Sequence, residues 1–202
     1  MKSAHFWFDP VCPWTYVTYQ WLDQARHARG IRIAPRLLSL YFLNQGRPVS
    51  EHTTAHRDSL QLERFLAFVR AASGGETMLE AYDSLARALF QRSAKPGPHL
   101  IAQTANVIGW EAGPALAAAA DDTWDATIRA DHDAAVALVG DDVGSPVIAL
   151  EDGPALFGPV FSRAPRGEDA GRLWDAFMTL SASPDFFELK RTRGPEVNLD
   201  FG

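Results

Sequence analysis

Apolar and polar positions in the first forty residues follow the order strand, helix, strand. Residues 4–8 are aromatic and β-prone, and an Asp-Pro pair ends the run. Apolar residues then recur at helical spacing from Pro13 to a stop at Gly30. Residues 31–40 return to an extended, alternating pattern. The segment therefore predicts a β-α-β unit.

The pattern changes over residues 50–140, where apolar residues repeat at helical spacing. Gly-Pro pairs at 97–98 and 113–114 punctuate this segment. It predicts four or five helices, the last over residues 131–139.

Strand character returns near the end of the chain. Residues 146–151 and 155–161 flank an Asp-Gly turn, which predicts a hairpin. An amphipathic helix is predicted over residues 167–181, where apolar side chains again follow helical spacing.

The order of these elements predicts the fold class. A β-α-β unit, a helical block and a β-β-α unit are what an α/β thioredoxin-like core with an all-helical insertion, a DsbA-like arrangement, would give. We expect residues 1–45 and 141–202 to form the core and residues 46–140 to form the insertion. The insertion would fold over one face of the core and leave a cleft near the first helix.

Composition narrows the class of function. The chain has 202 residues, 47% of them hydrophobic, which is enough to bury a sizeable core. A net charge of -6 argues against binding of nucleic acid. No apolar run approaches the length of a membrane span, and the N-terminal residues do not resemble a signal peptide. We therefore expect a cytoplasmic protein without a membrane partner.

The sequence also argues against a metal site. A single cysteine excludes an internal disulfide and a cysteine-rich zinc site. His52 and His56 are four residues apart, but no third ligand or catalytic carboxylate accompanies them. They are predicted to be ordinary surface histidines.

The only cysteine, Cys12, lies between the first predicted strand and helix. Pro13 then occupies the first helical position, so the sulfur would lie beside the free N–H groups of the helix N-terminus. Such a setting lowers the pKa of a thiol from about 8.5 toward 7 or below. The alternative is a buried, inert cysteine, but this placement favours a reactive one.

Thr15 lies in the first turn of the predicted helix. Its hydroxyl could donate a hydrogen bond to a Cys12 thiolate, or it could be an ordinary first-turn hydroxyl. It cannot attack a mixed disulfide at Cys12. A catalytic cycle on Cys12 therefore needs a second thiol from outside the protein.

Two further positions are predicted to lie beside the thiol. Pro146 begins a predicted strand after Gly144 and Ser145, and with a thioredoxin-like element order a cis Ser145-Pro146 bond is expected. Trp14 is predicted to be exposed beside the sulfur of Cys12, where its ring could stack on an aromatic substrate.

Four segments of the chain resemble one protein family. FWFDPVCPWT, VGSPVIAL, LFGPVFSRAPRGEDAGRLWDA and PDFFELKRTR are similar to the DsbA-like mycothiol-dependent nitroreductases of actinobacteria. These are cytoplasmic thioredoxin-fold proteins that use mycothiol as their reducing cofactor. The segments span both halves of the predicted core, whereas the insertion is only loosely similar.

The resemblance implies roles for individual residues. Cys12 would be the nucleophilic cysteine, Pro13 and Trp14 the interior of its motif, and Ser145 with Pro146 the cis-proline loop that faces the sulfur. The last four would contact the thiol cofactor. Better-known members have CPWC, with a second cysteine where this chain has Thr15, so the two-cysteine mechanism is closed here.

We therefore expect a monothiol oxidoreductase. A Cys12 thiolate would attack a disulfide or an electrophilic substrate, and mycothiol would release the enzyme. One alternative is a thiol transferase or isomerase similar to the kappa-class glutathione transferases and the 2-hydroxychromene-2-carboxylate isomerases. In those enzymes a hydroxyl-bearing residue at the helix start orients a bound thiol. A non-catalytic binding module is the other alternative.

Overall fold

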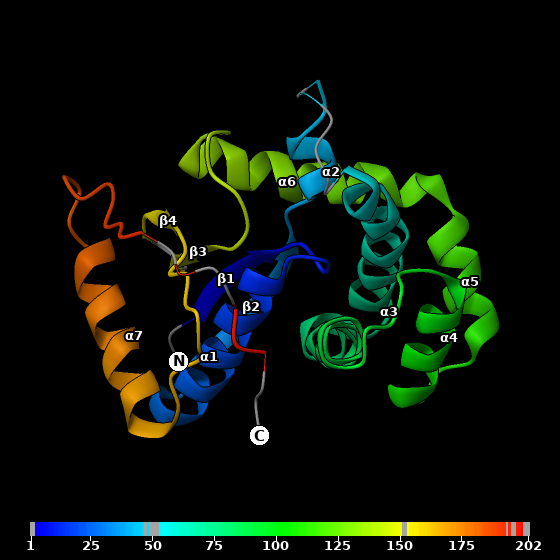
Figure 1. Cartoon of the computed structure of the whole chain (residues 1–202), viewed down its shortest axis with the longest axis horizontal. Helices are drawn as coiled ribbons and strands as arrows, with labels where there is room; N and C mark the ends of the chain where they lie inside the picture. The colour runs from blue at the N-terminus through cyan, green and yellow to red at the C-terminus, as the bar shows by residue number, and fades with distance from the viewer. Residues whose placement is uncertain are drawn as a thin grey trace.

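The helices and strands follow one another in the predicted order (Figure 1). The computed structural model describes residues 3–46, 48, 53–150, 153–192, 194 and 197–199. The N-terminal unit contains β1 (Ser3–Phe8), α1 (Pro13–Arg29) and β2 (Arg32–Leu37). The elements that follow are α2 (Leu40–Leu43), α3 (Thr53–Gln91), α4 (Pro98–Val107), α5 (Ala112–Ala120), a 3₁₀ turn (Asp122–Trp124), α6 (Asp125–Val139), β3 (Val147–Leu150), β4 (Ala155–Phe157) and α7 (Gly167–Ser181).

The four described strands form one mixed sheet in the order β2-β1-β3-β4. β1 runs parallel to β2 and antiparallel to β3, so that Phe6 lies opposite both Pro35 and Ile148. β4 is antiparallel to β3. The central strand β1 ends at Phe8, and the turn that follows carries Cys12 to the start of α1.

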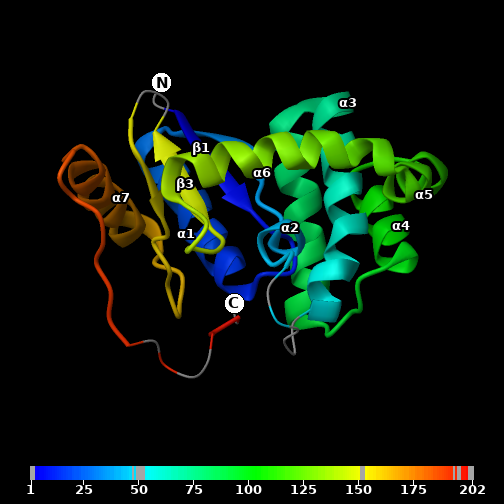
Figure 2. The same cartoon turned by 90° about the horizontal axis from the view of Figure 1, so that it is seen from above.

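Alternation along β1 divides the core between the two faces of the sheet. Ala4, Phe6 and Phe8 are buried on the side of α1 and α7, and Phe6 stacks on Tyr19 of α1. Trp7 points to the other face, where it packs in a cluster with Ala135 of α6. Because successive strand residues face opposite sides, one strand supports both layers. Figure 2 shows α6 crossing the sheet and α7 lying beside α1.

The ends of α1 follow from local sequence signals. Pro13 occupies the first helical turn, where its missing N–H costs nothing. Gly30 ends the helix in the left-handed conformation, with φ 63°, and its N–H bonds to the carbonyl of Arg26. These two residues delimit α1.

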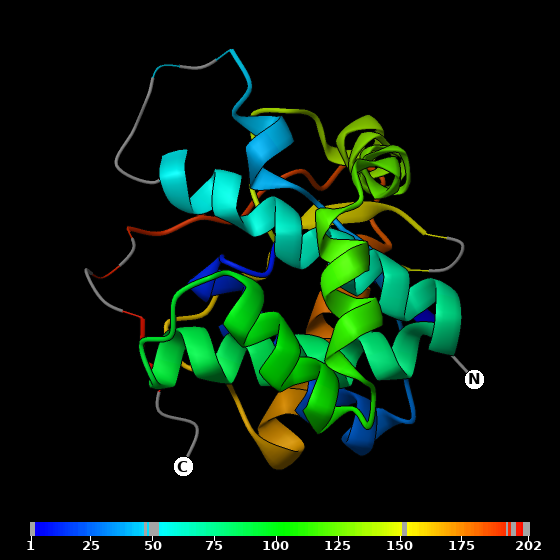
Figure 3. The same ribbon diagram turned by 90° about the vertical axis from the view of Figure 1, so that its right-hand side faces the viewer.

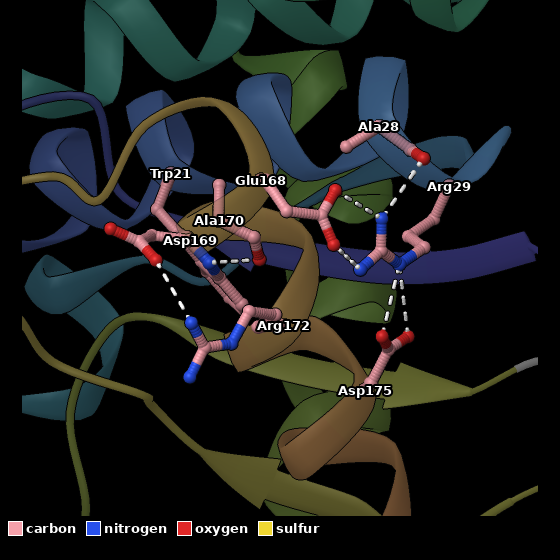
Figure 4. Close-up of polar contacts among 8 residues, drawn as sticks. All are labelled: Trp21, Ala28, Arg29, Glu168, Asp169, Ala170, Arg172 and Asp175. Carbon is pink, nitrogen blue, oxygen red and sulfur yellow. Dashed lines mark hydrogen bonds and ion pairs between the residues drawn. The ribbon is translucent and has the colours of Figure 1, made fainter.

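A polar clasp holds α7 against α1 (Figure 4). The indole N–H of Trp21 donates to the carbonyl of Ala170 at 3.1 Å. Arg29, near the end of α1, lies between Glu168 and Asp175 of α7 and pairs with both, as Figure 4 shows. The clasp attaches the middle and the C-terminal end of α1 to α7. The N-terminus of α1 carries Cys12 and belongs to the site described below.

The long helix α3 consists of two helices joined at Gly74. This residue has φ 85° and ψ -179°, which interrupts the helix. Figure 3 shows that α3 is bent. A Cβ atom on Gly75 would lie 2.8 Å from Cδ of Pro35, so the bend also allows a close approach to β2. The second half of α3 then packs over Phe8 and Tyr16.

A buried carboxylate ties α6 to the sheet and to α3. Asp131 accepts the backbone N–H of Leu37 at 3.1 Å and forms ion pairs with Arg36 and Arg70. Its carbonyl accepts the indole N–H of Trp7 at 3.0 Å. One residue of α6 therefore contacts β1, β2 and the first half of α3.

Two predicted strands are shorter than expected. β2 ends at Leu37, because Ser39 caps α2 by accepting the N–H of Phe42. β4 ends at Phe157, where a cis Gly158-Pro159 bond follows. Within the described residues, no helix is long and apolar enough to cross a membrane. The division of the chain into core and insertion stays a prediction.

Candidate active site

Cys12 occupies the N-cap position of α1. Its N–H donates to the carbonyl of Asp9 at 3.2 Å, and its own carbonyl accepts the N–H of Tyr16. The residue is 8% exposed, and its sulfur lies 3.7 Å from the carbonyl oxygen of Ser145. The thiol is therefore held between the helix start and a loop that is distant in sequence.

That loop contains a cis Ser145-Pro146 bond, as predicted. The hydroxyl of Ser145 lies 2.7 Å from the hydroxyl of Thr15 and accepts the N–H of Asp9 at 3.0 Å. The end of β1, the first turn of α1 and the cis-proline loop are thus locked together. Sequence reasoning missed the second cis bond, Gly158-Pro159.

Burial raises the pKa of the Cys12 thiol, and this is the largest influence on it. The hydroxyl and N–H of Thr15 and the N–H of Trp14 lower the pKa, whereas the charge of Asp9 raises it. The net direction is upward. The predicted lowering of the pKa is therefore wrong for the free enzyme, because desolvation outweighs the hydrogen bonds of the helix N-terminus.

The predicted site residues lie together at the start of α1 and in the cis-proline loop. One expectation differs, namely the exposure of Trp14. Thr15 and Ser145 are buried beside the sulfur. Pro13 and Trp14 are partly buried in the first turn of α1, so Trp14 is less exposed than expected. Pro146 follows Ser145 into β3. The roles of these residues stay predictions.

Comparisons with known proteins identify the family. Residues 11–191 match the model of the Rv2466c-like family, described as mycothiol-dependent nitroreductase Rv2466c. The chain belongs to this family. The uncharacterised protein Rv2286c of Mycobacterium tuberculosis is 32% identical over 96% of this chain and 84% of its own length.

Solved structures show the same fold. A probable DsbA oxidoreductase from Streptomyces coelicolor covers 98% of both chains with a TM-score of 0.65 and 18% identity. The cytosolic disulfide reductase DsbM from Pseudomonas aeruginosa, solved with GSH, matches 88% of this chain and 100% of its own, with a TM-score of 0.61 and 17% identity.

The predicted family and fold class are therefore confirmed. The chain has the DsbA-like thioredoxin fold with helices added between its two halves, and it belongs to a family of thiol-dependent oxidoreductases. Within that family its single cysteine, Cys12, is followed by Thr15 where the resemblance implies a second thiol.

Sequence reasoning missed two carboxyl groups beside this Rv2466c-like site. Asp9, predicted only to end a strand, is fully buried, and so is Glu63 in the first half of α3. Burial and the charge of Asp9 raise the pKa of Glu63 well above its usual value. A sequence signal existed, because Glu63 interrupts the apolar stripe of Leu62, Phe65 and Leu66.

Tyr82 lies in the second half of α3, within the segment where apolar spacing predicted helices. Its ring packs on Phe8 with centroids 4.1 Å apart. Among the described residues its fully buried hydroxyl has no hydrogen-bond partner. Burial, followed by the charge of Cys12, raises the pKa of this phenol, so the buried hydroxyl is neutral.

The histidine pair considered for a metal site cannot be placed as a pair, because His52 lies outside the described residues. Within the part of the chain that the structure describes, no group of three His, Cys, Asp or Glu side chains could hold a metal ion.

Proposed function

We propose that this chain is a monothiol thiol-disulfide oxidoreductase that uses mycothiol, with Cys12 forming the mixed disulfide. The observation that carries the proposal is the position of the only cysteine. It occupies the N-cap position of α1 with its sulfur beside the Ser145 carbonyl, and Thr15 stands where the resemblance implies a second thiol. Every disulfide that Cys12 forms is therefore with another molecule.

The proposed reaction is thiol-disulfide exchange. The Cys12 thiolate attacks one sulfur of a disulfide RSSR′, so that a Cys12–S–S–R bond forms and R′S⁻ leaves and takes up a proton. Cys12 is then displaced by exchange with an external thiol and regains its proton. Mycothiol supplies that thiol, and its sulfur forms the new disulfide with R.

The residues at the site fit a thiol ligand. Cys12 as a residue is 8% exposed, and Pro13 and Trp14 are partly exposed at the same helix start. We propose that Trp14 and Pro146 contact the cofactor and that the Ser145 backbone orients its sulfur. The Thr15 hydroxyl would stabilise the Cys12 thiolate both before attack and as the leaving group.

The upward shift of the Cys12 pKa also fits this cycle. Burial disfavours a thiolate but does not disfavour an uncharged mixed disulfide. The buried site therefore favours the adduct relative to the free thiolate.

A cytoplasmic location, with thiols kept reduced, is part of the proposal, and the cytosolic disulfide reductase DsbM shares the fold.

The test is steady-state turnover with a small disulfide substrate and mycothiol as the only reductant. We expect many turnovers per enzyme molecule, and much slower turnover with glutathione at equal concentration. Consumption of a single equivalent of thiol, followed by no further reaction, would instead support a binding module.

Thr15→Val is expected to slow alkylation of Cys12 by iodoacetamide about tenfold at pH 7. The Thr15 hydroxyl lowers the pKa of Cys12, so its removal disfavours the thiolate. A hydrogen bond to a charged group contributes about 1.5 kcal/mol, which corresponds to about a tenfold change in the thiolate fraction. Intact mass measures the adduct at the only cysteine. Thr15→Ser, which keeps the hydroxyl, serves as the control and should react like the wild type. Equal rates for all three proteins would show that this hydroxyl does not act on the thiol.

A further inference from the structure

Beside Cys12 the interior contains two carboxyl groups joined by one hydroxyl. Asp9, Ser59 and Glu63 are all fully buried. The Ser59 hydroxyl lies 2.8 Å from Oδ1 of Asp9 and 3.2 Å from Oε1 of Glu63. Because Asp9 follows β1 and the other two lie on α3, this group connects the Cys12 turn to the helical block.

The hydrogen-bond partners of the two carboxyl groups favour Asp9 as the charged member of the pair. Asp9 accepts the N–H groups of Val11 at 2.9 Å and Leu40 at 2.7 Å in addition to the Ser59 hydroxyl. Three donors stabilise an anion. Oε2 of Glu63, by contrast, is buried and has no partner among the described residues.

Two carboxylates that share one hydroxyl in the interior cannot both be ionised without a large cost. Desolvation first, and then the charge of Asp9, raises the pKa of Glu63, while the Ser39 and Ser59 hydroxyls oppose the shift only in part. The single proton of the pair therefore resides on Glu63.

The pair is coupled to the thiol through Asp9. The carbonyl of Asp9 accepts the Cys12 N–H, and the N–H of Asp9 donates to the Ser145 hydroxyl. The negative charge of Asp9 also opposes formation of a thiolate at Cys12. A second charge in the same group would oppose it further.

We propose that Asp9 and Glu63 hold one proton between them and that this proton controls the ionisation of Cys12. While Glu63 is protonated, Cys12 faces one negative charge. When Glu63 loses its proton, the doubly charged pair disfavours the thiolate, so the two ionisations oppose each other. Both carboxyls are positioning residues, because they act through Cys12.

The nearby titratable groups His132 and Tyr82 add no charge next to the carboxyl pair near pH 7. His132 of α6 is buried, and burial lowers its pKa, so it is neutral near pH 7. On the same helix, the charge of Asp133 raises the pKa of His132 and the charge of Arg129 lowers it. Arg129 lies over the ring of Phe42. Tyr82 of α3 is also neutral, because its pKa is raised.

The experiment is the pH dependence of Cys12 alkylation in the wild type, Glu63→Gln and Asp9→Asn, with Glu80→Gln as the control on the exposed side of α3. We expect a broad transition for the wild type and Glu80→Gln, since two coupled protons are involved. Glu63→Gln should give a single-proton transition and at least threefold faster alkylation above the pH at which Glu63 ionises. Asp9→Asn, which removes the fixed charge, should shift the whole profile to lower pH.

A Glu63→Gln profile that superimposes on that of the wild type would overturn the proposal.

If Asp9→Asn does not fold, the pH dependence of the melting temperature of Glu63→Gln is a second test. Because the pKa of Glu63 is higher in the folded than in the unfolded chain, this residue stabilises the fold at low pH and loses that contribution as pH rises through its folded pKa. Glu63→Gln should therefore remove part of the fall in melting temperature with rising pH, and an unchanged dependence would contradict the proposal.

This inference deepens the proposed function and concerns the same thiol. The alkylation rate, however, measures the reactivity of the Cys12 thiol directly and needs neither substrate nor mycothiol. A protein that failed to turn over with mycothiol but showed the predicted profiles would refute the proposed function and leave the carboxyl pair supported.

Discussion

Cys12→Ser is expected to lower mycothiol-dependent turnover by at least about 1,000-fold, because it removes the nucleophile on which the whole cycle depends. A serine hydroxyl is not ionised near pH 7 and cannot form a disulfide. The measurement is the steady-state rate with a disulfide substrate at saturating mycothiol, compared with that of the wild type under the same conditions.

The control for this variant is its stability. Serine is close in shape to cysteine, and its hydroxyl can keep the polar contact that the sulfur makes with the Ser145 carbonyl. We therefore expect Cys12→Ser to unfold within about 1 kcal/mol of the wild type. A folded Cys12→Ser protein with unchanged turnover would refute the monothiol mechanism and favour a transferase or isomerase that only binds the thiol.

Asp131→Ala is expected to destabilise the protein by about 3–5 kcal/mol, since it leaves two arginines and one backbone N–H without their buried partner. For a chain of this length the loss corresponds to a fall of roughly 10 °C in melting temperature. Thermal and urea unfolding measure it at neutral pH.

Asp133→Ala is the matched control, because Asp133 lies on the same helix but is exposed. It should change the free energy of unfolding by no more than about 0.5 kcal/mol. If the two variants were equally stable, Asp131 would not hold α6 to β2 and α3 in the way the structure indicates.

Local sequence signals were enough to predict most elements of the core. Pro13 and Gly30 delimit α1 because the first tolerates a missing N–H and the second adopts a left-handed backbone. Residues 167–181, predicted from helical spacing, form α7. The cis bond at Ser145-Pro146 required the element order as well as the local sequence.

Properties that depend on distant segments could not be predicted in this way. The sign of the Cys12 pKa shift was wrong because desolvation of the sulfur depends on segments that fold over it from elsewhere in the chain. The charge state of Glu63 depends on Asp9, which is 54 residues away in sequence (63 minus 9). Helical spacing alone could not show that the hydroxyl of Tyr82 is buried with no hydrogen-bond partner among the described residues.

The intact mass of the protein after reaction with mycothiol disulfide, before and after addition of excess mycothiol, tests whether Cys12 cycles through a mixed disulfide. We expect one mycothiol adduct, located on Cys12, that excess mycothiol removes completely. Absence of an adduct on folded protein, or an adduct that excess mycothiol does not remove, would contradict the claim that Cys12 cycles through a mixed disulfide.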